Sequence, residues 1–265
     1  MKLGISNLFE KKVSKDNYEF LIKDLHCIDW APTVSFGNWE KIFVNKPSDS
    51  TNLKYDLSAL QSIFFGVNRA SLLSNDDDFY ILLEHFKNLI DLCEYYKVKY
   101  ILWGAPGTRI YKIADLSNAI IYERIEQILS LFDNTSVILL LEAVSPKYNC
   151  QFINSTLDLL QFYDKNRHRN IALHLDIGQM LDEGLNVLDI LQTYKEEVVH
   201  LHLSNPDYTY TKELFSLFLG VIDIFDYENN VDIVYEIQNL DQFDVQSLKH
   251  DLNKLLEKVN DKKRQ

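Results

Sequence analysis

The sequence predicts an α/β fold in which eight parallel strands close into one (β/α)8 TIM barrel. Short β-branched or aliphatic runs alternate with longer helix-period segments, eight such strand–helix units follow one another, and 265 residues is a usual length for this barrel. A doubly wound open sheet would show the same alternation. However, no GxGxxG or GxxxxGK[ST] phosphate loop is present, and no Pro/Gly/Ser-rich linker divides the chain. We therefore expect a single TIM-barrel domain over residues 1–265.

The elements of this barrel can be placed along the chain from their hydrophobic patterns. The segment Pro32–Ser58 is long and irregular, so we expect a lid or substrate loop there. Asp77–Tyr96 is predicted to be an amphipathic helix, with apolar residues at helical spacing, and Asn75 and Asp76 can cap its N-terminus. The acidic run Asp76–Asp78 could bind a metal, but we prefer to explain it by its favourable position at the helix N-terminus. The eight predicted strands span Lys2–Asn7, Cys27–Ala31, Ala59–Phe65, Tyr100–Gly104, Val137–Glu142, Ile171–Asp176, Val198–Leu203 and Asp232–Ile237.

Composition excludes several classes of function. Asp and Glu number 39 against 27 Lys and Arg, a net charge of −12. Nucleic-acid binding usually needs a basic stripe, so nucleic acid is not an expected partner. No apolar run is long enough to cross a bilayer, and the first residues lack the apolar region of a signal peptide. Three widely spaced cysteines without a CxxC pair fit reduced thiols, and we expect a cytoplasmic protein.

The last four of the eight predicted strands each carry, at their carboxyl end, a residue that can bind a metal ion. Glu142, Asp176, His202 and Glu236 follow one another at intervals of 34, 26 and 34 residues, each close to one βα unit. The carboxyl ends of barrel strands converge on one mouth, so these groups would face a common centre. Three buried carboxylates repel one another unless a cation lies between them. The pattern predicts a divalent metal site, with Mn²⁺, Mg²⁺, Co²⁺ and Zn²⁺ all open.

Taken singly, these residues also have structural explanations. Asp176 could cap the following helix, and Glu142 or Glu236 could pair with a lysine. The joint occurrence of four such groups at successive strand ends favours the metal site.

Two further histidines lie on the same strands. Because side chains alternate along a strand, His174 shares a face with Asp176, and His200 shares one with His202. We expect His174 and His200 one layer deeper, where they would hydrogen-bond and orient the ligands above them. The competing assignment makes His200 the ligand in place of His202.

Short motifs accompany the four strand ends: Leu-Gly-Ile-Ser at 3–6, Ala-Pro-Thr at 31–33, Leu-Gln-Ser at 60–62, Leu-Asp-Ile-Gly at 175–178, His-Leu-His-Leu-Ser at 200–204 and Tyr-Glu at 235–236. Together with the ordered Glu, Asp, His, Glu set, they resemble the xylose isomerase-like TIM-barrel superfamily, the sugar phosphate isomerase/epimerase group related to endonuclease IV. The similarity runs from Leu3 to about Glu257. It implies that the four strand-end residues hold a divalent metal and that Glu142 and Glu236 form a catalytic pair on opposite faces of a sugar.

The resemblance therefore implies a divalent-metal-dependent isomerase or epimerase of sugars or sugar phosphates. A metal that chelates a carbonyl and a neighbouring hydroxyl stabilises the enediolate formed when one glutamate removes a proton, and the second glutamate can return one. The alternatives are a metal-dependent dehydratase or hydrolase acting on a polyol acid, and a barrel that binds a sugar derivative without turnover. The expected partner is a small-molecule sugar or sugar phosphate. Barrels of this kind often form homodimers, although no sequence feature here specifies an interface.

The sequence departs from the family pattern at several positions. Gln179 stands where many relatives have a histidine, and Asn205 stands where some have a carboxylate, which gives the non-catalytic alternative some weight. Gln179 can still hydrogen-bond a sugar hydroxyl, and we expect it to bind substrate. Phe64, Phe65 and Trp103 close earlier strands, so the trinuclear zinc site of endonuclease IV cannot be built. This makes DNA repair a distant alternative.

Further substrate contacts are expected at the mouth. Trp103, Phe36 and Trp39 could stack on a sugar ring, although core packing is an equal explanation. Asp29, inside a predicted strand, needs a partner, which could be a substrate hydroxyl or a salt bridge. Two basic residues that could hold a phosphate or carboxylate of the substrate, or lie exposed to solvent, are Lys147 and Arg109.

Overall fold

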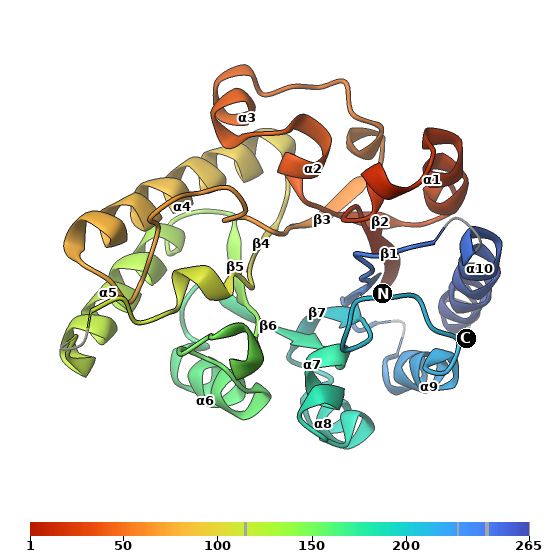
Figure 1. Ribbon diagram of the computed structural model, residues 1–265. Coiled ribbons are helices and arrows are strands. Elements are labelled where there is room, and N and C mark those ends of the chain that lie inside the picture. Colours follow the sequence, from red (N-terminus) through yellow and green to blue (C-terminus); the bar gives the residue numbers. More distant parts are fainter. Residues whose placement is uncertain (114–115, 227, 242–243, 265) are drawn as a thin grey trace.

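The computed structural model describes residues 1–113, 116–226, 228–241 and 244–264, and its eight strands form a closed parallel barrel in sequence order (Figure 1). Strands β1 and β8 pair side by side and close the ring. The predicted (β/α)8 barrel is therefore confirmed. The strands are β1 (Lys2–Ser6), β2 (Cys27–Trp30), β3 (Asp56–Leu60), β4 (Tyr100–Trp103), β5 (Ile138–Leu141), β6 (Ile171–Asp176), β7 (Val198–Leu203) and β8 (Asp232–Tyr235).

Helices surround the strands as an outer ring (Figure 1). The long helix α4 begins as predicted, because the side chain of Asn75 accepts a hydrogen bond from the backbone N–H of Asp78 at 2.9 Å. The helices are α1 (Lys15–Ile22), α2 (Pro32–Phe36), α3 (Trp39–Asn45), α4 (Asp76–Tyr96), α5 (Asn118–Phe132), α6 (Thr156–Asn166), α7 (Ile177–Asp182), α8 (Val187–Tyr194), α9 (Phe215–Ile224) and α10 (Val245–Lys262), with single 3-10 turns η1 (Glu10–Lys12), η2 (Thr51–Lys54), η3 (Pro106–Thr108) and η4 (Pro146–Tyr148).

The third strand lies earlier in the chain than its apolar run predicts. It covers Asp56–Leu60 rather than Ala59–Phe65, and Ser62 adopts a left-handed backbone with φ of 51°, which interrupts extended structure. The apolar residues that follow serve the core instead, since the Phe64 ring lies 5.2 Å from that of Phe86 on α4. Their hydrophobicity reflects packing against a helix and not a strand.

The segment 32–58 is also more regular than predicted. Pro32 occupies the first turn of α2, and the side chain of Asn38 accepts a hydrogen bond from the backbone N–H of Lys41 to begin α3. Both signals are present in the sequence, but the helices are too short to show a clear apolar period. This segment is therefore a pair of short helices that pack on the barrel, with β3 taking its last residues.

The interior of the barrel is divided between an apolar and a polar half. Ala59, Tyr100, Leu102 and Leu140 of β3 to β5 form a small apolar cluster separate from the main core between strands and helices. Buried polar side chains of β2 and of β6 to β8 occupy the remainder. All three cysteines are buried and unpaired. In the described part of the chain, no helix combines the length and apolar character that a membrane span requires.

Candidate metal centre and active-site cavity

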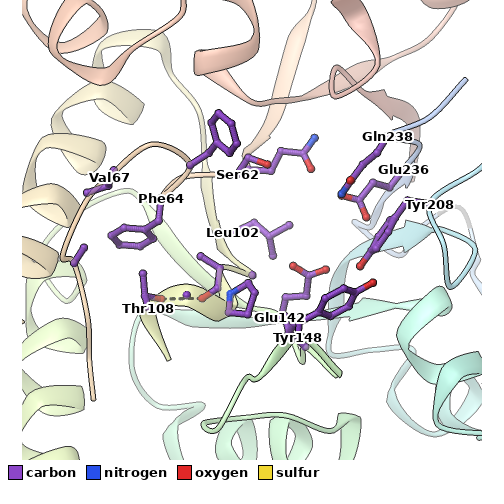
Figure 2. A pocket seen from close by; sticks show the side chains of 18 of the residues that line it. Ser62, Phe64, Val67, Leu102, Thr108, Glu142, Tyr148, Tyr208, Glu236 and Gln238 are labelled. Carbon is purple, nitrogen blue, oxygen red and sulfur yellow. Dashed lines mark hydrogen bonds between the residues drawn. The ribbon is translucent and has the colours of Figure 1, made fainter. Parts of the chain in front are cut away.

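Four acidic and imidazole side chains meet at the carboxyl end of the barrel. Glu142, Asp176, His202 and Glu236 each offer one ligand atom, and these atoms all lie within 4.8 Å of one another. They come from the ends of β5 to β8, as the sequence predicts. Glu142 and Glu236 line a cavity of about 450 Å³ at this end of the barrel. Figure 2 shows both side chains at its wall.

The position of Glu142 depends on a glycine in the neighbouring strand loop. A Cβ atom placed on Gly104 would lie 1.7 Å from the Glu142 carboxylate, so the absence of a side chain there leaves room for it. The backbone N–H of Glu142 donates to the carbonyl of Trp103, and its own carbonyl accepts a hydrogen bond from the Arg109 guanidinium at 2.9 Å. The carboxylate is thus pressed against β4 and directed into the cavity.

Asp176 is held by both the helix it precedes and the next strand. One carboxylate oxygen accepts the backbone N–H of Gln179 at 2.6 Å, which caps α7. The Ser204 hydroxyl lies 2.9 Å from both carboxylate oxygens and accepts the N–H of Gly178 at 2.8 Å. A Cβ on Gly178 would meet Ser204 at 2.6 Å, so glycine permits this close approach. Helix capping and a place in the cluster are therefore compatible for Asp176.

His202 presents one ring nitrogen to the carboxylates and fixes the other. Its Nε2 lies 2.8 Å from Asp29, whose carboxylate can only accept, so Nε2 carries a proton, and in the neutral imidazole the lone pair is on Nδ1. Nδ1 lies 3.2 Å from a Glu236 oxygen and 3.7 Å from Asp176. Both Nδ1 and that Glu236 oxygen are buried and lack a hydrogen-bond partner among the described residues. The carboxylates around Nδ1 need a positive charge beside them, either a proton on Nδ1 or a metal ion in its place, so these residues fit a divalent cation.

His174 and His200 lie fully buried beside His202, and His200 bonds to the same aspartate. The Nδ1 atoms of His174 and His200 are 2.9 Å apart, and His200 Nε2 lies 3.1 Å from Asp29. Both ring nitrogens of His200 are therefore engaged, which favours His202 over His200 as the metal ligand. The three histidines are also close enough to one another to enclose an ion, but a hydrogen bond already joins His174 to His200, and Asp29 bonds to His200 and His202.

The charges in this cluster shift one another's protonation. Burial, and then the neighbouring Glu236 and Asp176, raise the pKa of Glu142 to about 8. Burial lowers the pKa of His202, but the carboxylates around it outweigh this and raise it well above its usual value. Burial also opposes the charge on Asp29, yet its two histidine partners lower its pKa. Without a cation, the cluster thus holds protons that a metal ion would displace.

Several expected substrate contacts lie elsewhere. Trp103 is fully buried, donates to the Thr108 hydroxyl at 2.9 Å and packs on Phe86, so it belongs to the core and not to the cavity wall. Asp29 is likewise buried and is used by the two histidines. Phe36 packs edge-on against a core tryptophan, and Trp39 donates to the Phe65 carbonyl. None of these four expected contacts, Trp103, Asp29, Phe36 and Trp39, lines the described cavity.

The polar candidates are also occupied by the protein itself. The Gln179 amide oxygen accepts the backbone N–H of Ser145 at 2.9 Å, and its NH₂ group bonds to Glu183. Lys147 pairs with Asp182 at 2.9 Å and stands apart from the cavity wall. Arg109 is fully buried, where it donates to the carbonyl oxygens of Ala105, Glu142, Phe152 and Ile153. These residues build the mouth loops, and the substrate role expected of them is not supported by their positions.

The cavity wall is made by residues that sequence reasoning missed. Tyr148, Tyr208 and Gln238 stand around the two glutamates, and Phe64 and Leu102 form an apolar side (Figure 2). Tyr148 ends the 3-10 turn η4 after β5 and Tyr208 lies in the loop after β7, and neither segment has a periodic pattern that marks a side chain as facing inward. Each tyrosine follows, within a few residues, a strand that carries a predicted metal ligand. This position is the one sequence signal that could have indicated that they face the cavity.

Comparisons with known proteins agree with this architecture. A family model described as the xylose isomerase-like TIM barrel matches residues 49–224. A 3-keto-D-glucoside 4-epimerase from E. coli shares a TM-score of 0.68 and 14% identity over 97% of this chain and 99% of its own. An L-ribulose 3-epimerase has a TM-score of 0.69 and 13% sequence identity, over 100% of this chain and 96% of its own.

A dehydratase has a comparable fold. The probable 3-DHS dehydratase of Bacillus anthracis shares a TM-score of 0.64 and 16% identity over 97% of this chain and 99% of its own. No curated protein sequence matches the chain. At these identities, the structural similarities establish the fold alone.

Proposed function

The chain belongs to the xylose isomerase-like TIM-barrel family, and we propose that it is a divalent-metal-dependent isomerase or epimerase of sugars or sugar phosphates. The observation that supports this most directly is a cluster of three carboxylates and one imidazole, in which two glutamates also face one cavity. A simple binding site for a sugar has no need to bury three carboxyl groups around one histidine nitrogen.

Glu142, Asp176, His202 and Glu236 would hold the cation. Three oxygen donors and one nitrogen suit Mn²⁺, Mg²⁺, Co²⁺ or Zn²⁺. When bound, such an ion supplies the positive charge that stabilises negative charge developing on a substrate oxygen. Asp29 assists from behind, because its hydrogen bond fixes the tautomer in which His202 Nδ1 is free to coordinate.

Glu142 and Glu236 are placed to move a proton on carbon. They come from β5 and β8, and both line the same cavity (Figure 2). In the proposed reaction one carboxylate accepts the proton next to the sugar carbonyl, and the other protonates the opposite face, which inverts that carbon. Return of the proton to the neighbouring carbon would instead exchange aldose and ketose.

A dehydratase is the second candidate, since one protein of similar fold is described as one. It would begin with the same proton abstraction and then expel a hydroxyl group as water. A barrel that binds a sugar derivative without turnover is the third candidate, and Gln179 and Asn205, which motivate it, are bonded within the mouth loops.

The test is exchange of carbon-bound hydrogen in D₂O. Mn²⁺-loaded protein is incubated with D-fructose, D-tagatose, D-allulose and L-ribulose and with their phosphates, and deuterium beside the carbonyl is measured by NMR. We expect exchange with at least one sugar and its loss in Glu142→Gln and Glu236→Gln, whereas Glu257→Gln, an exposed control on α10, stays active. Full exchange after chelation, or metal binding without exchange in the whole panel, contradicts the proposal. Loss of water without epimer formation identifies a dehydratase.

A further inference from the structure

The loop that follows β7 contains a tight turn built around Asn205. The Asn205 amide donates to the hydroxyl and the carbonyl of Thr209, at 3.0 and 3.3 Å, and its oxygen accepts the N–H of Asp207 at 2.9 Å. Its backbone carbonyl accepts the N–H of Tyr208 at 2.9 Å. Tyr208 itself has a left-handed backbone with φ of 57°, a conformation that a non-glycine residue adopts only when its surroundings impose it.

This turn is tied to the segment that carries Glu236. The carbonyl of Tyr208 accepts hydrogen bonds from the backbone N–H groups of Gln238 and Asn239, at 3.0 and 3.2 Å. Thr209 and Asn239 also form an isolated parallel bridge. The backbone of Tyr208 is therefore fixed relative to a residue two positions beyond Glu236.

The Tyr208 hydroxyl is directed into the cavity and has no partner in the described protein. Figure 2 shows it pointing inward, and Tyr208 lines the cavity with Glu142 and Glu236. No hydrogen bond of this hydroxyl to a described residue is found. Burial, and then Asp176, Glu236 and Glu142, raise the pKa of the phenol well above its usual value, so it stays protonated. A protonated phenol is a neutral hydrogen-bond donor at any physiological pH.

We propose that Tyr208 binds an uncharged hydroxyl or carbonyl oxygen of the substrate beside the glutamate pair, and that Asn205 is the residue that positions it. This proposal rests on the function proposed above. It implies that the end of the sugar that contacts Tyr208 is uncharged. A phosphate or carboxylate at this end would face three carboxylates. The basic residues of the cavity wall, Arg69 and Lys112, belong to the loops after β3 and β4, across the barrel from β7 and β8, and Arg69 already pairs with Asp78 at 2.8 Å. An anionic substituent of the substrate must therefore point toward those loops.

The proposal also accounts for Asn205. A carboxylate at this position could accept the N–H of Asp207 but could not donate to Thr209. The amide satisfies both bonds, so an asparagine serves the turn where an acid would not.

The experiment compares Tyr208→Phe with Tyr122→Phe, an identical change on α5 where the side chain is 68% exposed. Mn²⁺ affinity, KM and kcat are measured with the sugar of the panel that exchanges best, and binding of xylitol, a polyol that cannot react, is measured by calorimetry. We expect Tyr208→Phe to weaken xylitol binding and raise KM about tenfold, corresponding to about 1.4 kcal/mol, with Mn²⁺ affinity unchanged. Tyr122→Phe should behave as wild type.

The role of Asn205 is tested by a double-mutant cycle. If Asn205 acts through Tyr208, Asn205→Ala should raise KM in the wild type and add little in the Tyr208→Phe background. Additive effects overturn the positioning role, and unchanged KM and xylitol affinity in Tyr208→Phe overturn the binding role. If wild type binds xylitol and responds to Tyr208→Phe but exchanges no sugar, only the proposed reaction fails. If neither xylitol nor any sugar binds, both proposals fail.

Discussion

Replacing Glu142 by glutamine should stabilise the metal-free protein while removing its response to metal. Burial and the neighbouring carboxylates raise the pKa of this group from 4.5 to about 8 in the folded protein. Between these two values the unfolded chain ionises while the folded protein keeps its proton. Ionisation therefore favours the unfolded state, and glutamine, which has the same shape and no charge, is free of this effect.

The size of the effect follows from the two pKa values. The cost to the folded state is absent well below pH 4.5, grows by about 1.4 kcal/mol per pH unit above it, and levels off above pH 8. It amounts to about 1 kcal/mol at pH 5, about 3 kcal/mol at pH 7 and about 5 kcal/mol at the plateau. The advantage of Glu142→Gln over wild type should grow in the same way.

Urea unfolding in EDTA at pH 5, 7 and 8.5 measures this advantage, with Glu257→Gln as the exposed control. The same titrations with Mn²⁺ at about 100 times the wild-type Kd should stabilise wild type by about 2.7 kcal/mol and the Glu142→Gln variant by much less. A variant that is less stable than wild type in EDTA at pH 7 would refute the reasoning. So would a variant that gains as much from Mn²⁺ as wild type does.

Three further predictions concern the surroundings of the site. Gly104→Ala should displace Glu142 and weaken Mn²⁺ binding measured by calorimetry, whereas Gly107→Ala, with open space at the Cβ position, should not; equal affinities would contradict the close packing. Asp29→Asn should weaken Mn²⁺ binding by about 10- to 100-fold, because the histidine tautomer is no longer fixed; an unchanged Kd would exclude this role. Burial lowers the pKa of His85 to about 4, so unfolding free energy should fall by about 3 kcal/mol between pH 6.5 and 4; a His85→Gln variant that loses as much stability would assign that loss to other groups.

The sequence predicts the barrel and its polar strand ends because both depend on local patterns. A buried β-strand is predicted from a run of apolar residues. Polar groups at the ends of such runs are conspicuous because a buried strand end rarely tolerates them, which is how the sequence indicates Glu142, Asp176, His202 and Glu236. The third strand shows where this fails, since the run through Phe64 is equally apolar but packs on a helix. An apolar run indicates burial without saying against which element.

The roles of single polar residues depend on partners that the sequence does not bring together. Asp29 binds a histidine 173 positions away across the barrel, so its isolation in a strand indicates a partner but not which one. Lys147 and Gln179 have side chains that could bind a sugar or its phosphate. In the structure they instead form an ion pair with an acidic residue and hydrogen bonds with acidic and backbone groups. Tyr208 faces the cavity because an asparagine turn and the next strand loop hold it there.

The central claim is that one divalent cation is held by the four strand-end side chains. The most direct test is a crystal structure of protein soaked in Mn²⁺, with anomalous diffraction recorded at the manganese edge. We expect one strong peak within bonding distance of Glu142, Asp176, His202 and Glu236, and no such peak in Glu142→Gln crystals soaked in the same way. A mouth without a peak, or a peak bound by other residues, would contradict the claim.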